Sequence, residues 1–319
     1  RQRQGSVQDR NLGKDLQLAA DEVYKVTDFD QVDGWTQKYQ RYQNEIKYNG
    51  TYESIKGRLE SLEAGAVVLD LGTGRGELAF TIADQLPRVQ VKGVDLILDE
   101  EKIEEKYSNR ENLEFKRQPS ATSFGLESYS VDIIVMNAVM HHVESQFIKD
   151  FIEELKRVLK PQGRIILIED SYSTEADFNE NADQELTHEF LKLTKEYGDQ
   201  FAVDFFALND WLVGVVHKDS MPYPFTYRSM EQWQEFFEEK GFFPTYTRQL
   251  GFTVKGFHKP AKGILEFGQM DYLRGLKKVL PGVSVLLFDC DQFFALPADD
   301  LSSDELEAIF KREKLMPLK

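Results

Sequence analysis

The sequence predicts an α/β protein built on a mostly parallel sheet with helices on both faces. From residue 66 onward, short apolar runs alternate with helical segments, as expected for buried strands joined by crossover helices. The apolar runs are continuous rather than alternating, which indicates strands buried on both sides. A glycine-rich turn follows the first run and leads into a helix. The 319 residues allow one large domain or about two.

The individual elements follow from the same patterns. Residues 35–63 are expected to be helical, because Trp35, Tyr39, Tyr42 and Ile46 recur three to four residues apart. The elements expected next are strand 66–70, helix 77–86, strand 89–95, a short strand 113–117, strand 131–137, helix 144–160 and strand 164–169, with a turn at 161–163. Beyond residue 170 we expect an aromatic-rich, partly helical segment, a helix opened by a capping box at Ser229 and Gln232, strands at 243–252 and 283–289, and a helix near 303–314.

Composition excludes several function classes. The chain has 39 Lys and Arg against 55 Asp and Glu, a net charge of −16, which argues against nucleic-acid binding. Its single cysteine, Cys290, forms no intramolecular disulfide and no cysteine-based zinc site. The sequence has no apolar run of the roughly 20 residues that a membrane helix needs, and no secretory leader is visible. We therefore expect a cytoplasmic protein with no membrane partner.

The most informative motif is the turn after the first strand. Asp70 ends the apolar run, and Gly72, Gly74 and Gly76 follow at alternate positions before a helix. Glycine allows sharp turns and close approach of a ligand to the backbone, and the helix start offers free N–H groups. The dinucleotide fingerprint G-x-G-x-x-G places its third glycine one residue later, where this chain has Glu77. A pyrophosphate is therefore not the expected ligand.

This motif and the segments after it resemble the class I S-adenosylmethionine-dependent methyltransferases over roughly residues 60–170. The resemblance implies a Rossmann-like methyltransferase fold with a seven-stranded sheet, and S-adenosylmethionine as cofactor with S-adenosylhomocysteine as product. It implies that Asp95 holds the ribose, that Asn137 and Ala138 hold the methionine ammonium, and that Ser120 and Ala121 flank the adenine. Ser120 departs from the family, which usually has an acid there. The full cofactor set is Asp70, Gly72, Thr73, Gly74, Gly76, Asp95, Leu96, Ser120, Ala121, Asn137 and Ala138.

Candidate catalytic residues follow the fourth and fifth strands. Methyl transfer is a displacement in which positioning supplies much of the acceleration, and a base is needed only when the acceptor must lose a proton. His141 and His142 have a side chain suited to proton transfer near neutrality, and Glu169 ends the fifth strand. Candidate substrate contacts are His142, Trp211, Tyr223, Tyr227 and Arg228. No metal site is predicted, and Asp204, Asn209 and Asp210 are interpreted as a solvated helix edge.

The resemblance also suggests how the chain is divided. We expect a disordered start at 1–14, an N-terminal helical lid at 15–64 and a cofactor-binding core at 65–172. An inserted acceptor-site cap at 173–228 follows, then the remainder of the core at 229–297, with one helix and the last two strands, and a helical tail at 298–319.

The function predicted from these features is methyl transfer from S-adenosylmethionine to an oxygen, nitrogen or carbon atom of a small, partly apolar or aromatic acceptor. A protein methyltransferase is an alternative, because an acidic surface attracts basic peptides. A second alternative is a catalytically inactive methyltransferase-like binding protein. An NAD-dependent oxidoreductase is disfavoured by the glycine spacing. The oligomeric state is left open, with a homodimer as one option.

Overall fold

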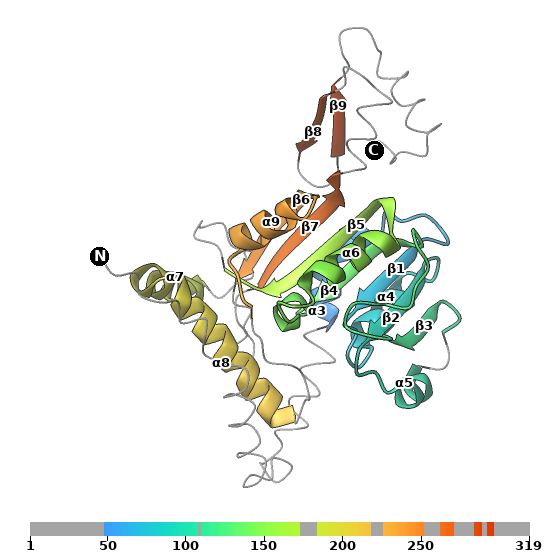
Figure 1. The fold of residues 1–319 in the computed structure, drawn as a ribbon, viewed down its shortest axis with the longest axis horizontal. Helices are drawn as coiled ribbons and strands as arrows, with labels where there is room; N and C mark the ends of the chain where they lie inside the picture. Colours follow the sequence, from blue (N-terminus) through green and yellow to red (C-terminus); the bar gives the residue numbers. More distant parts are fainter. Residues whose placement is uncertain are drawn as a thin grey trace.

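The computed structural model describes residues 48–107, 110–172, 184–217, 226–251, 262–270, 284–288 and 292–296. The expected disordered start, most of the expected lid and the expected tail lie outside these residues. The helices are α3 (Tyr48–Leu59), α4 (Glu77–Gln85), α5 (Glu100–Tyr107), α6 (Ile148–Val158), α7 (Gln184–Tyr197), α8 (Asp199–His217) and α9 (Met230–Glu239), with a 3-10 turn η4 (Met140–His142) (Figure 1). The strands are β1 (Val67–Leu71), β2 (Gln90–Asp95), β3 (Leu113–Arg117), β4 (Val131–Asn137), β5 (Leu159–Asp170), β6 (Phe242–Gly251), β7 (Lys262–Gln269), β8 (Ser284–Phe288) and β9 (Gln292–Leu296).

Seven of these strands form one sheet in the order β3-β2-β1-β4-β5-β7-β6. The first five run parallel, and β7 lies antiparallel between β5 and β6. At the centre, Val68 of β1 pairs with Val91 of β2 on one side and Ile133 of β4 on the other. The strand order reverses between β1 and β4, the point where open α/β sheets bind ligands beyond their carboxyl ends.

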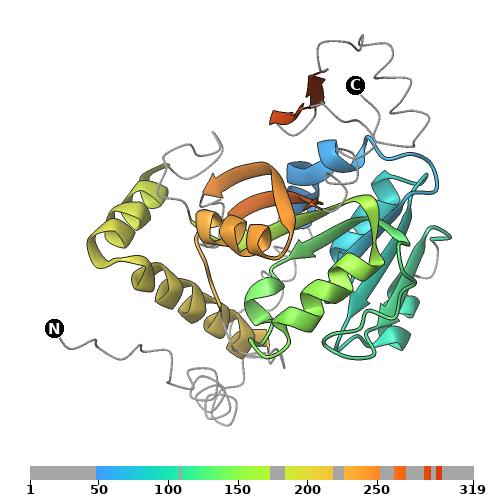
Figure 2. The same cartoon turned by 45° about the horizontal axis from the view of Figure 1, so that its top comes forward.

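Helices cover both faces of this sheet, which confirms the predicted fold class. One face is covered by α6 and α9 (Figure 2). Buried side chains such as Leu155 of α6 and Trp233 of α9 belong to the core on this face. The other packs against α3 and α4 through Ile55 and Ile82. Apolar runs buried on both sides are what a parallel sheet between two helical layers requires.

The seventh strand is not where the sequence analysis put it. The expected strand 283–289 exists as β8, but among the described strands it pairs with β9 alone, in a separate two-stranded antiparallel sheet. The seventh place in the main sheet belongs to β7, which periodicity missed because Glu266 interrupts its apolar run. That carboxylate is 1% exposed and lies 2.7 Å from Arg164 Nη1 and 3.4 Å from Arg58 Nε. Two cations from distant segments thus allow an acid inside the strand.

The expected turn at 161–163 is also wrong in detail. Leu159 pairs with Val131 and Arg164 pairs with Ile133, so the intervening residues form an irregularity within β5 rather than a connection before it. At Gly163 a Cβ would lie 2.9 Å from the carbonyl oxygen of Asp132. Glycine therefore lets the bulged strand pass close to β4.

The inserted segment between β5 and α9 contributes α7 and α8, which lie to one side of the sheet (Figure 1). A separate apolar cluster forms there around Tyr172, Phe190 and Phe206. The chain leaves and re-enters the core at one place. The amide of Met230 donates to the carbonyl of Tyr172 at 2.8 Å, and Ser171 Oγ donates to the carbonyl of Arg228 at 2.9 Å.

Candidate functional site

The glycine turn after β1 is folded tightly against β2 and β4. Gly72, Gly74 and Gly76 have φ angles of +75°, +57° and +80°, the left-handed region that glycine adopts without strain. The amides of Gly72 and Thr73 donate to the carbonyl of Val94 at 2.8 and 3.0 Å. A Cβ on Gly72 would lie 2.5 Å from Val139 Cγ2, so this position also needs glycine for space.

Asp70 holds the turn in shape from inside the protein. Its side chain is 2% exposed, and Oδ2 accepts hydrogen bonds from Thr73 Oγ1 at 2.7 Å and from the Ala79 amide at 3.1 Å. Burial raises the pKa of this carboxyl to about 7, although the two hydrogen bonds oppose the shift. Asp70 and Thr73 therefore connect the glycine turn to the first turn of α4.

Asp95 ends β2 and faces the same turn. Its Oδ2 accepts from the Gly74 amide at 2.9 Å and its Oδ1 from the Ile97 amide at 3.0 Å. A carboxylate oxygen can accept two hydrogen bonds, so each oxygen retains capacity for a hydroxyl of a diol. Leu96 and Ile97 expose apolar surface beside it, at 39% and 52%. The residues present here fit a nucleoside.

The loop after β3 lies next to Asp95. The amide of Gln118 donates to the Asp95 carbonyl at 2.8 Å, which brings Ser120 and Ala121 to the same edge of the sheet. Ser120 is exposed, and its Oγ accepts from the Thr122 amide at 3.3 Å. The structure therefore brings the proposed ribose and adenine residues together.

The residues at the end of β4 form the next part of the candidate site. Asn137 is the last residue of this strand, and Ala138 has a φ of +59°, an uncommon value for a residue other than glycine. The Ala138 amide donates to the carbonyl of Ile168 at 2.8 Å. The next two amides, of Val139 and Met140, donate to Glu169 Oε1 at 3.1 and 2.7 Å. Glu169 thus fixes the backbone that follows Asn137.

His141 lies fully buried between two carboxylates. Its Nδ1 contacts Glu169 Oε2, and its Nε2 lies 2.9 Å from Asp210 Oδ2 of α8. Burial lowers the pKa of the imidazole, but the charges and hydrogen bonds of the two carboxylates outweigh it and raise the pKa to about 10. His141 is therefore an imidazolium near neutral pH.

Asp210 is the site residue whose surroundings the sequence analysis misjudged. It was interpreted as part of a solvated helix edge, yet its carboxylate contacts His141 and accepts a hydrogen bond from the Tyr227 hydroxyl. Burial raises the pKa of Asp210, but the hydrogen bond and charge of His141 lower it overall. The Tyr227 ring stacks on His141, with centroids 4.7 Å apart and planes at 23°. The sequence offered no signal for this pair, because its partners lie 69 and 17 residues away.

The other proposed catalytic and substrate residues have different surroundings. His142 is half-buried, and its ring centroid lies 4.1 Å from that of His141. Arg228 places its guanidinium over the rings of Trp233 and Phe236, at 4.7 and 4.8 Å from their centroids, so it packs on α9. Trp211 follows Asp210 in α8. Tyr223 lies outside the described residues.

The site also has the donor atoms of a metal centre. One ligand atom each from His141, His142 and Asp210 lie within 4.8 Å of one another. The 2.9 Å between His141 Nε2 and Asp210 Oδ2 is, however, shorter than the roughly 3.3 Å that two ligands keep around a tetrahedral zinc ion. The arrangement fits an ion pair better than a coordination sphere.

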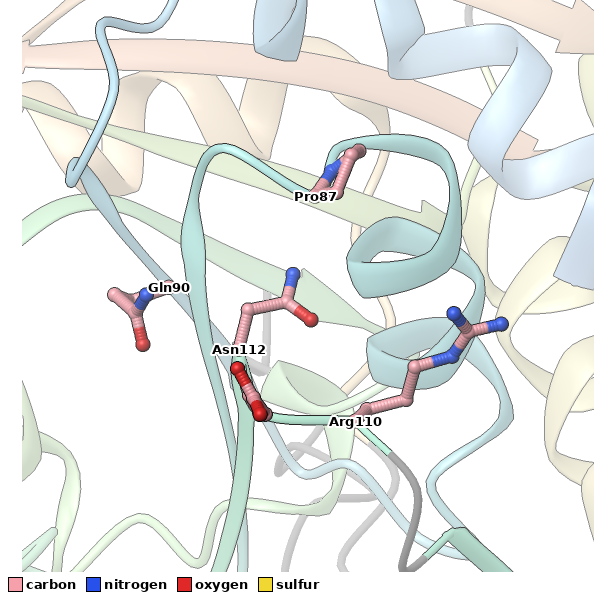
Figure 3. A pocket seen from close by; sticks show the side chains of 5 residues that line it. Pro87, Gln90, Arg110 and Asn112 are labelled. Atoms are coloured by element: carbon pink, nitrogen blue, oxygen red, sulfur yellow. The ribbon is translucent and has the colours of Figure 1, made fainter.

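A surface cavity of about 400 Å³ lies away from this site (Figure 3). Pro87, Gln90, Arg110, Glu111 and Asn112 line it, where β2 and β3 begin rather than end. Asn112 Nδ2 donates to the carbonyls of Ala83 and Val89 at 3.0 and 3.1 Å, so its amide fastens the surrounding loops. This cavity plays no part in the site at the glycine turn.

Among the described helices, none combines the length and the apolar character that crossing a membrane requires.

Comparisons with known proteins agree with this geometry. The family model described as a methyltransferase domain matches residues 62–241, more than half of the chain. A ubiquinone/menaquinone biosynthesis C-methyltransferase, UbiE, from Syntrophotalea carbinolica is 30% identical over 115 residues, which cover 36% of this chain and 48% of the relative. A demethylmenaquinone methyltransferase from Lactococcus lactis is 30% identical over 114 residues, or 34% and 44% of the two chains. The chain thus spans about half the length of the curated relatives it matches.

Solved structures of more distant proteins also resemble it. A SAM-dependent methyltransferase from Aquifex aeolicus has 18% identity and a TM-score of 0.44, covering 78% of this chain and 97% of that one. The 1,6-didemethyltoxoflavin-N1-methyltransferase of Burkholderia thailandensis has 14% identity and a TM-score of 0.47, covering 80% and 90%. These likenesses are too distant to bear on activity. The family match across residues 62–241 is decisive: the chain belongs to the methyltransferase domain family, the class I S-adenosylmethionine-dependent methyltransferases.

Proposed function

We propose that this chain transfers a methyl group from S-adenosylmethionine to a small, partly apolar or aromatic acceptor held between the carboxyl ends of β4 and β5 and the cap. The observation that carries the proposal is the contact of Asp210 and Tyr227 with His141. These two cap residues lie directly on the loop that follows β4. A cap seated against this loop favours a small, enclosed acceptor over an extended chain.

The cofactor half of the site fits the nucleoside and amino-acid ends of S-adenosylmethionine, which supplies an electrophilic methyl group when bound. Asp95 offers carboxylate lone pairs for a ribose diol. Gly72 lets the turn pack directly against Val139, because a Cβ there would lie 2.5 Å from Val139 Cγ2. The carbonyls of Asn137 and Ala138 are the candidates for the methionine ammonium.

The residues at the ends of β4 and β5 would orient the acceptor and exclude water. Glu169 fixes the loop after β4 through two amides, and it holds His141 through the ring. Since His141 is buried and charged, its suited role is orientation. His142 is half-buried beside it and remains the candidate for removing a proton from the acceptor.

Carbon is the acceptor atom to test first. The curated relatives are named as a ubiquinone/menaquinone biosynthesis C-methyltransferase and a demethylmenaquinone methyltransferase. An electron-rich ring of that kind is planar and partly apolar, in keeping with a cap that places the Tyr227 ring on the loop after β4.

A protein acceptor is the second candidate, favoured by the net charge of −16, which would attract a basic peptide. The two candidates differ in salt dependence. The rate of methylation of a basic peptide, which the acidic surface attracts over a long range, would fall steeply between low and physiological ionic strength. The rate of methylation of a neutral ring would not.

The experiment has two stages. Calorimetric titration with S-adenosylmethionine, S-adenosylhomocysteine and NAD should show micromolar binding of the first two alone, lost in Asp95→Ala. Glu114→Ala, an exposed acid on the neighbouring strand β3, serves as the matched control and should bind as the wild type does. Release of S-adenosylhomocysteine is then measured with demethylated hydroquinones and with basic peptides. No binding by the wild type would refute the enzyme, and release with peptides alone would refute the small acceptor.

A further inference from the structure

The cap is joined to the core by a contact between a buried imidazole and a partly buried carboxylate, which the methyltransferase chemistry does not by itself require. Among the described residues of α8, Asp210 reaches His141 on the loop after β4, at 2.9 Å between Oδ2 and Nε2. His141 in turn contacts Glu169 at the end of β5. A continuous row of ionisable groups therefore runs from the sheet into the cap.

The three groups depend on one another for their charge. An imidazolium sealed from water needs a compensating negative charge, and two carboxylates near each other need a cation between them. His141 and Glu169 are both 0% exposed and belong to the core. Asp210 belongs to the cap, so both ring nitrogens of His141 face a carboxylate only when the cap lies in this position.

Tyr227 strengthens the same contact from the other end of the inserted segment. Its hydroxyl donates to Asp210, its ring stacks on His141, and the amide of Thr226 donates to the His141 carbonyl at 3.0 Å. The Asp210 carboxylate thus contacts both the His141 imidazolium and the Tyr227 hydroxyl. It connects α8 and the segment before α9 with the core.

We propose that Asp210 is a positioning residue that holds the cap closed over the acceptor site by pairing with His141. This rests on the proposed function in one respect, namely that the acceptor binds beneath the cap. Closure by this pair sets the His141 ring and the adjacent His142 in place, and it removes water from the site. Opening the cap separates His141 from Asp210 and exposes both charged groups to solvent. In this open state the site is hydrated and the acceptor can bind or leave.

The first test is hydrogen exchange, which needs no acceptor. In Asp210→Asn, the amides of α8 should exchange at least about tenfold faster than in the wild type, as expected when the ion pair with a buried imidazolium is broken. Asp204→Asn is the matched control: it makes the same change on the same helix, at an exposed residue whose partner is Gln200. Its α8 amides should exchange at the wild-type rate. Equal exchange in Asp210→Asn and the wild type would overturn the proposal.

A second variant guards against general unfolding. If the amides of β1 and β4 also exchange faster in Asp210→Asn, the comparison moves to Tyr227→Phe, which removes the hydroxyl donated to Asp210 and leaves the stacked ring. This variant should speed exchange in α8 by a smaller factor and leave β1 and β4 unchanged. Wild-type exchange in α8 of Tyr227→Phe would then overturn the proposal.

Kinetics separate positioning from a merely structural role. Asp210→Asn should raise the KM for the acceptor and lower kcat, with the Kd for S-adenosylhomocysteine unchanged, and Asp210→Glu should recover part of the loss. A lower active fraction with unchanged KM would count against positioning. If instead the wild type binds Zn²⁺ alone with a stoichiometry of one, and Asp210→Asn does not, the cluster is a metal site and the ion-pair proposal falls. Failure of the proposed function would appear separately, as absent binding of S-adenosylmethionine.

Discussion

Gly72 and Gly74 have similar left-handed backbones but different surroundings, and that difference separates two reasons for glycine. Around Gly74 a Cβ would meet nothing within 4 Å, whereas at Gly72 it would lie 2.5 Å from Val139 Cγ2. Gly74 therefore requires glycine for its dihedral angles alone. Gly72 requires glycine both for its dihedral angles and because a Cβ would collide with Val139.

Alanine at these two positions should show the difference in unfolding free energy. Gly74→Ala should cost about 1 kcal/mol, the penalty of a left-handed alanine. Gly72→Ala should cost about 3 kcal/mol, because strain and the collision with Val139 add. Urea unfolding followed by circular dichroism measures both, and Val139→Ala in the Gly72→Ala background should recover part of the loss. Equal costs for the two alanines would contradict this explanation.

The residues that the sequence predicted and those it missed differ in how local their partners are. The glycine turn and the position of Asp95 at a strand end were predicted because strand ends and backbone angles leave a pattern in nearby residues. Asp210 was assigned to a solvated edge, since nothing near it in sequence reveals that His141 lies 2.9 Å away. The contact between His141 and Asp210, which lie 69 residues apart, is brought about by the fold and leaves no local sequence pattern.

At the scale of elements, β7 shows how a strand can be hidden from periodicity. Its buried residues include Glu266, and a carboxylate in the middle of a run normally indicates an exposed segment. Here Arg164 of the neighbouring strand β5 and Arg58 of α3 neutralise it. The uninterrupted apolar run at 283–289 predicted a strand there instead. By contrast, β2 and β4 contain no buried charged side chain, and the buried Asp70 comes only at the last but one residue of β1, so these strands were predicted closely.

Glu266→Gln should therefore destabilise the protein strongly, by about 3 kcal/mol, because two partly buried arginines lose their shared anion. Glu114→Gln offers a matched control on β3, where an exposed acid pairs with Lys92, and should change the unfolding free energy by less than about 1 kcal/mol. Chemical denaturation of both variants at the same pH measures the difference. Similar values would show that Glu266 is tolerated rather than required.

The start of α9 is a local feature that the sequence predicted fully. Ser229 Oγ accepts from the Gln232 amide at 3.1 Å, and Gln232 Oε1 accepts from the Ser229 amide at 2.9 Å. Ser229→Ala should lower the unfolding free energy by about 1 kcal/mol, the usual value of a helix N-cap. Ser229→Asp should retain most of the stability, and thermal melts of the two variants check this. An alanine variant as stable as the wild type would mean that tertiary packing alone fixes the helix start.

At the scale of the whole molecule, the buried charges make stability depend on pH. The pKa of His141 is raised from about 6.5 in an unfolded chain to about 10 in the folded protein. A group with a raised folded pKa contributes fully below its unfolded pKa and loses that contribution as pH rises through the folded value. The groups that face His141 are Glu169, Asp210, His142 and Tyr227, with Asp170 and Arg228 acting on those partners.

We therefore expect the unfolding free energy to fall by a few kcal/mol between pH 6.5 and 10, and to fall less in His141→Gln. Asp70 has a pKa raised by burial to about 7, so its own contribution is lost between about pH 4 and 7, below most of this window. Urea unfolding at intervals of half a pH unit resolves the two ranges. A flat profile above pH 7 in the wild type would contradict a charged, buried His141.

The chain leaves the sheet at Tyr172 and returns at Met230 within a single 2.8 Å hydrogen bond. The core therefore closes on itself whatever lies between these residues, and exchanging the intervening segment for one of another length carries only a small, logarithmic loop-closure entropy. Insertions at such sites are tolerated well when their ends are adjacent. Under the proposed function, acceptor choice can thus change by exchange of this segment while the cofactor half of the core stays the same.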